Sequence, residues 1–170
     1  MIHPIRAMKA KLVSVGLLLV GVATVGMPAF ATTTVSTTFT VTATVNATCT
    51  IAATAMNFAT AYTGAATIDA TSTITATCTN TTAYKIGLDA GTTTGATTTN
   101  RLLAGAGGAT LKYQLYQDSG YKNYWGNVTN VESGTGNGSA QTLTVFGQIL
   151  SGQYPAPGAY TDTVTASIIY

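Results

Sequence analysis

The stretch FTVTATVNATCTI, from Phe39 to Ile51, decides the fold. Its apolar residues fall at every second position, first from Phe39 to Val45 and then again at Cys49 and Ile51. A period of two predicts β-strands with one buried face, and the threonines between them are β-branched residues that favour strands. We therefore expect one strand at 38–45 and a second at 48–54.

The same alternation recurs along the rest of the chain, which holds 36 threonines in 170 residues. Turn-rich segments such as 91–95, 105–108 and 134–138 separate the alternating stretches, and none of them shows a helical stripe. Counted from Cys49, the predicted core strands are 48–54, 70–79, 83–89, 109–117, 140–147 and 160–170, with a short edge piece near Arg101–Leu103. Short strands between glycine-rich turns indicate a single all-β sandwich.

The predicted sandwich lacks a strand at its C-terminal end and has a surplus strand at its N-terminal end. An immunoglobulin-like sandwich needs about seven strands, and the predicted strand 160–170 has no following strand to cover it. The surplus strand 38–45 would have to lie parallel to 48–54 to fill that gap in its own domain. Only residues 46–48 connect them, whereas parallel neighbours need a crossover of a dozen residues or more. The surplus strand is therefore predicted to complete a neighbouring molecule, by donor-strand complementation.

The N-terminal residues predict export. Basic residues up to Lys11 precede an apolar run at 12–25, and Ala29-Phe30-Ala31 is a small-residue cleavage site. A transmembrane anchor is the alternative, but Pro28 and small polar residues dilute the run and no basic stop-transfer cluster follows. Met8 is an alternative start. The predicted divisions of the chain are a signal peptide at 1–31, a donor segment at 32–47 and a β-sandwich domain at 48–170.

The charges of the exported part exclude several functions. Residues 32–170 hold four basic and five acidic side chains, and four less five leaves a formal charge of −1. So few basic groups cannot neutralise a run of phosphates, which argues against nucleic-acid binding. The only histidine, His3, leaves with the signal, and no convincing carboxylate pair remains. We expect no enzyme activity, no catalytic residue, no metal site and no cofactor.

Cys49 and Cys78 are the only cysteines. An even pair in an exported chain predicts a disulfide, because disulfides persist outside the cytoplasm. Their spacing excludes a CxxC redox motif, and the lack of other soft ligands argues against a metal site.

Taken together, these residues resemble the spore coat protein U domain family, found in subunits of archaic (Csu-type) chaperone–usher pili. The stretches that carry the resemblance are 39–51 (FTVTATVNATCTI), 73–79 (TITATCT), 111–118 (LKYQLYQD), 145–149 (VFGQI) and 158–164 (GAYTDTV). One departure is Asn57-Phe58-Ala59, where the family usually shows Phe-Gly.

The resemblance implies an incomplete immunoglobulin-like fold that lacks its last strand and is completed by a donor strand from a neighbouring subunit. It implies related subunits in a head-to-tail homopolymer, a periplasmic chaperone and an outer-membrane usher as partners. It also implies passage through the periplasm to a secreted surface fibre that serves adhesion and biofilm formation. On this basis the donor residues are Phe39, Val41, Ala43 and Val45, and the acceptor groove is lined by Val164, Ala166, Ile168 and Tyr170.

Two other functions stay open at this point. One is a sugar-binding surface or tip module that uses Tyr121, Tyr124 and Trp125, although packing in the core or a loop is the preferred interpretation of these aromatic residues. The other is a structural protein of a spore coat.

Overall fold

The computed structural model describes residues 31–58 and 61–170. The predicted signal peptide, apart from residue 31, lies outside the described residues. The chain divides into two units, Met1–Thr42 and Ala43–Tyr170, and all regular secondary structure of the described residues belongs to the second.

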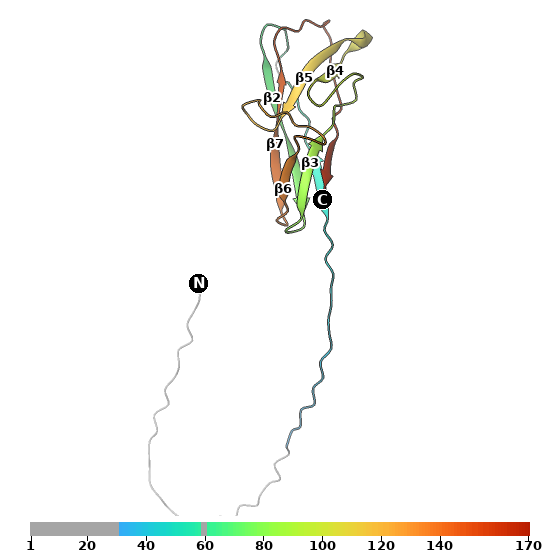
Figure 1. The fold of residues 1–170 in the computed structure, drawn as a ribbon, viewed down its shortest axis with the longest axis vertical. Helices are drawn as coiled ribbons and strands as arrows, with labels where there is room; N and C mark the ends of the chain where they lie inside the picture. The colour runs from blue at the N-terminus through green and yellow to red at the C-terminus, as the bar shows by residue number, and fades with distance from the viewer. Residues whose placement is uncertain (1–30, 59–60) are drawn as a thin grey trace, which may run out of the picture. The chain divides into compact units, whose positions relative to one another are not determined.

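The described residues of the second unit form eight strands and one short helical turn (Figure 1). In chain order they are β1 (Cys49–Ala53), β2 (Ile68–Cys78), β3 (Ala83–Leu88), β4 (Arg101–Ala104), η1 (Ala106–Gly108), β5 (Thr110–Tyr116), β6 (Glu132–Thr135), β7 (Ala140–Ile149) and β8 (Ala166–Ile169). Among the described residues the only helix is η1, whose three residues are far too few to cross a membrane.

The strands form two antiparallel sheets. One has five strands in the order β1-β2-β7-β5-β4, and the other has three in the order β6-β3-β8. Alternate side chains of both sheets meet in one core, which places Ile74, Ile86 and Trp125 among the fully buried residues. The all-β sandwich predicted from the period-two pattern is confirmed.

Some strand boundaries differ from the predicted ones. The strand β6, whose sequence is ESGT, was not predicted, because a segment with no apolar residue carries no alternation signal. The predicted strand 160–170 is paired along β3 only from Ala166 to Ile169. The predicted strand 38–45 is assigned no hydrogen-bonded ladder in the chain.

Candidate functional site

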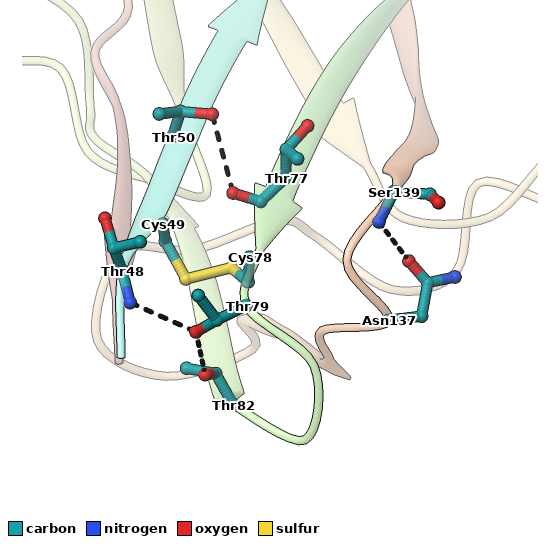
Figure 2. The surroundings of a disulfide bond; sticks show 9 residues. All are labelled: Thr48, Cys49, Thr50, Thr77, Cys78, Thr79, Thr82, Asn137 and Ser139. Carbon is teal, nitrogen blue, oxygen red and sulfur yellow. Dashed lines mark hydrogen bonds between the residues drawn. A yellow bond between two sulfur atoms is a disulfide. The ribbon is translucent and has the colours of Figure 1, made fainter. Parts of the chain in front are cut away.

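The disulfide lies at the beginning of the edge strand β1 (Figure 2). Cys49 and Cys78 are bonded to each other, with their Cα atoms 4.1 Å apart, and they form the first cross-strand pair of the β1–β2 ladder. This confirms the predicted pairing. Next to the bridge, the Thr48 amide donates to Thr79 Oγ1 at 3.2 Å, and the Thr79 amide donates to the Thr48 carbonyl at 3.0 Å. The start of β1 is therefore fixed by one covalent bond and two hydrogen bonds.

The predicted donor segment is exposed. Residues 31–47 have no assigned secondary structure, and each is exposed to solvent. The side chains of Phe39, Val41 and Val45 are 85%, 80% and 86% exposed, and Ala43 is exposed as well. Burying a row of large apolar side chains such as these is favourable, because it removes apolar surface from water and so lowers the free energy.

A large apolar cavity of about 1000 Å³ lies within the second unit, between its two sheets. That volume is at the upper end of the range for small-molecule pockets, and it interrupts a core that would otherwise be close-packed. The strand residues that line it are Ala53, Ile68, Ser72, Ile74, Leu88, Leu103, Leu111, Tyr113, Leu115, Val145, Ile149 and Ala166. Loop residues 54–58, 61–63, 153–158 and 160–164 form the rest of the wall.

The cavity lies beside two unpaired strand edges. β1 is paired only with β2, and β8 is paired only with β3, so each leaves one edge without ladder hydrogen bonds. The two strands approach each other without pairing, and the C-terminus lies at the same end of the unit as the start of β1 (Figure 1). Unpaired edges that flank an apolar cavity are the features that a bound strand would complete.

The predicted groove residues occupy different places. Val164 and Ala166 line the cavity, and Ile168 is half-buried against the core. Tyr170 is 57% exposed and lies outside the cavity lining. Alternation in the sequence predicts which side chains of this segment point inward. It does not predict that β2, β5 and β7 also supply parts of the cavity wall.

Two carboxylates fix the segment that leads into β8. Asp89 Oδ1 accepts the Thr165 amide at 2.9 Å, while the Asp89 amide donates to the Thr165 carbonyl at 3.1 Å. Asp162 accepts the Tyr113 hydroxyl at 2.7 Å and the Thr92 amide at 2.9 Å. These side-chain acceptors supplement the backbone hydrogen bonds at the two ends of 161–165, which pair Thr161 with Ala104 and Thr165 with Asp89, and together they hold this wall of the cavity in place.

A buried cation supports the same region, and no pattern in the sequence indicates it. Arg101 is fully buried and donates four hydrogen bonds, all to backbone carbonyls. The acceptors are the carbonyl oxygens of Leu88, Asp89, Thr98 and Trp125, at 2.8–2.9 Å. A guanidinium group can serve several acceptors at once, because its five N–H donors point in fixed directions.

The aromatic residues at 121–125 do not form the platform considered from the sequence. Trp125 is fully buried, and its indole Nε1 donates to the Ile86 carbonyl at 2.9 Å. Tyr124 stacks on Tyr116 with 4.9 Å between the ring centroids. A sugar site that includes Trp125 is therefore excluded, and the preferred interpretation of this residue as core is confirmed.

Among the described residues, no group of three or more histidine, cysteine, aspartate and glutamate side chains is placed to hold a metal ion. The site has apolar side chains at its base and free backbone groups at its rim, which are the two kinds of contact that β-strand addition uses.

Comparisons with known proteins identify a family and a similar fold. A family model described as the Spore Coat Protein U domain matches residues 35–167. Among solved structures, the chain is similar to a chain in the crystal structure of the CsuC-CsuE chaperone–tip adhesion subunit pre-assembly complex from archaic chaperone–usher Csu pili of Acinetobacter baumannii. The identity is 24% and the TM-score 0.58, over 75% of this chain and 41% of that one, so the likeness shows a shared immunoglobulin-like fold. A search among curated proteins found no match.

Proposed function

Because the chain belongs to the Spore Coat Protein U domain family, we propose that it is a structural subunit of a secreted surface fibre and not an enzyme. Residues 38–45 of one copy enter the cavity of the next copy and complete its sandwich. The contact is head-to-tail, and head-to-tail contacts that do not close into a ring produce filaments.

The observation that carries this proposal is the apolar cavity of about 1000 Å³ next to the free edge of β8. A donor strand on that edge would supply the missing backbone hydrogen bonds, each contributing about 0.5–1.5 kcal/mol. Its alternate side chains, Phe39, Val41 and Val45, would leave water at a gain of about 1.5–3 kcal/mol each, and the smaller Ala43 would add less. The proposed domains follow: a signal peptide at 1–31, a donor segment at 32–47 and an acceptor domain at 48–170.

The same proposal includes the route to the surface. A subunit with an unfilled apolar cavity would aggregate if released alone, so a periplasmic chaperone holds it until an outer-membrane usher adds it to the fibre. The similar solved structure supports this, since its description names a chaperone–subunit pre-assembly complex. The finished fibre is extracellular and serves adhesion and biofilm formation.

Self-complementation tests the cavity directly. A copy of residues 36–47 is joined to Tyr170 through a short flexible linker, so that it can run back antiparallel to β8 as a hairpin would. We expect a soluble monomer that melts at a distinctly higher temperature than the unextended chain. The matched control carries Phe39→Asp and Val41→Asp in the appended copy only. Equal melting temperatures for the two extended chains would overturn the proposed groove.

Deletion of residues 32–45 tests the donor. The shortened subunit keeps its acceptor cavity, so it should still bind the chaperone and be able to accept a donor strand, but it has none to offer. Electron microscopy of cells that express only this variant should show no fibres. Fibres of normal length and number would show that the donor lies elsewhere.

A further inference from the structure

The outer face of the five-stranded sheet carries a second surface that the fibre proposal does not use. On this face the outward residues of neighbouring strands form rows across the sheet. One row is aromatic, with Tyr116 of β5 opposite Phe146 of β7. The next row is polar, with Gln114 of β5 opposite Gln148 of β7 and Gln148 opposite Asp69 of β2.

Tyr121 covers the junction of these two rows. Its ring is nearly perpendicular to those of Tyr116 and Phe146, with centroids 5.4 Å and 6.5 Å away. Burial and then the negative charge of Asp69 raise the pKa of Tyr121, which places its phenol near that carboxylate. The ring is half-buried, so part of it stays open to solvent.

The backbone of Tyr121 is held in an unfavourable conformation. Its φ is +54°, in the left-handed region that large side chains rarely adopt. Asp118 fixes the surrounding hairpin by accepting the amides of Gly120 and Asn123 at 2.9 Å and 2.8 Å. A bulky residue held in this region points to a role for the ring at that position.

The polar row contains an acceptor that is not satisfied within the described residues. Gln148 Nε2 donates to Asp69 Oδ1 at 3.0 Å, but Gln114 Oε1 is buried and has no hydrogen-bond partner there. Gln114 also lines a small cleft of about 190 Å³, together with Lys112, Leu150, Ser151 and Gln153. The polar row therefore runs across the sheet from Asp69 of β2 through Gln148 of β7 to Gln114 of β5, and the cleft adjoins it at Gln114.

We propose that this face, from Tyr121 past Gln114 to the cleft, binds a neutral oligosaccharide. A pyranose ring has apolar C–H faces that stack on an aromatic ring such as that of Tyr121, and hydroxyls at its rim that donate to an exposed acceptor such as the Asp69 carboxylate. Residues 112–116 of β5 span about 13 Å at the usual rise per residue, which suits more than one sugar unit. Asp69 would repel an anionic sugar unit stacked on Tyr121, whereas Lys112 adds a positive charge only at the cleft end of the face.

Saturation-transfer NMR and calorimetry test the proposal. The sample is the secreted chain as purified, either as single subunits or as fibres. The probes are tetrasaccharides of β-1,4-linked glucose, mannose and galactose, with a tetramer of galacturonate as the anionic comparison. We expect at least one neutral probe to bind, with transfer to its ring C–H protons, and the galacturonate tetramer to bind more weakly.

Variants locate the site. Tyr121→Gly removes the ring while tolerating the positive φ, so it should fold and weaken binding about tenfold, the effect of losing one aromatic contact. Tyr121→Phe should restore stacking, and Asp69→Ala should weaken binding. Val128→Ala, which shortens an exposed apolar side chain that lines neither this face nor the large cavity, should not change it. The proposal is overturned if none of the neutral probes binds at millimolar concentration, or if Tyr121→Gly binds as tightly as the parent chain.

Discussion

Tyr113 donates its hydroxyl to Asp162 Oδ2 at 2.7 Å, which joins the inward face of β5 to the segment that precedes β8. The other oxygen of the same carboxylate accepts the Thr92 amide. Asp162 therefore connects β5, the loop that follows β3 and the segment that precedes β8, which are far apart in sequence.

Asp162→Ala should lower the free energy of unfolding by about 2–3 kcal/mol, because hydrogen bonds to a charged group are worth more than neutral ones and their donors would be left unpaired. Tyr113→Phe removes only one of these bonds and should cost about 1 kcal/mol. Urea unfolding followed by the fluorescence of Trp125, the only tryptophan, measures both. Equal effects of the two substitutions would contradict the proposed role of Asp162 as a three-way connection.

Alkaline pH should destabilise the domain through Tyr113. Burial first, and then the hydrogen bond to Asp162, raise the pKa of Tyr113 far above its usual value near 10. In the unfolded chain the phenol ionises near pH 10, whereas in the folded chain it stays neutral. Its contribution is therefore complete below pH 10 and falls as the pH rises further. Tyr113→Phe should flatten the decline of the urea midpoint between pH 10 and 11.5, and an unchanged slope would contradict this.

Acid should act on the same wall through Asp89. Burial raises the pKa of Asp89, but hydrogen bonds from the Thr165 and Gly91 amides and the charge of Arg101 lower it, and the net direction is downward. A carboxyl with a lowered pKa adds stability above its unfolded pKa near 4 and loses it as the pH falls below that value. Asp89→Asn keeps an acceptor oxygen but cannot titrate, so its unfolding midpoint should depend less on pH between 5 and 2.5. Identical pH profiles for the two chains would exclude Asp89 as a source of acid sensitivity.

Arg101→Lys should be strongly destabilising although it keeps the charge. An ammonium group has three donors in a compact cluster and cannot reach the four carbonyls that Arg101 serves. Buried acceptors left without donors cost about 1–3 kcal/mol each, so we expect a loss of at least 2 kcal/mol in urea unfolding. Lys112→Arg, an exchange of the same two side chains at an exposed position, is the matched control and should change stability by less than about 0.5 kcal/mol.

Removal of the disulfide should cost about 3–4 kcal/mol, because the bridge closes a loop whose ends are 29 residues apart. The double variant Cys49→Ser with Cys78→Ser should therefore melt well below the oxidised chain, and dithiothreitol should shift the oxidised chain towards it. A reduced chain that melts at the oxidised temperature would contradict this assignment of stability.

The sequence could predict those parts of the fold that repeat with a period of two. The alternation around Ile74, Ile86 and Val145 places inward and outward residues correctly, because a strand buried on one face must alternate. It could not find β6, which pairs with β3 through backbone groups alone, or the true extent of the last strand. Those features depend on which strands become neighbours.

The candidate site was only partly predictable for the same reason. Val164 and Ala166 could be placed on the groove side by alternation, but the cavity between the sheets depends on residues from strands distant in sequence. Arg101 resembles an ordinary edge residue in the sequence, and only the folded chain brings four carbonyls around it. Proximity in sequence can also mislead. Tyr121, Tyr124 and Trp125 are close together in the chain, but Trp125 is fully buried in the core, whereas Tyr124 stacks on Tyr116.

The position of the bridge between Cys49 and Cys78 has a mechanical consequence for a head-to-tail polymer. Tension along such a fibre reaches each subunit through residues 46–48, directly before the first rung of the β1–β2 ladder. A five-residue edge strand pulled from that end would unzip one rung at a time, and each rung would resist with only one or two hydrogen bonds. The covalent link sits at the first rung of the ladder, so the pull passes into the long neighbouring strand β2 and β1 is spared from peeling.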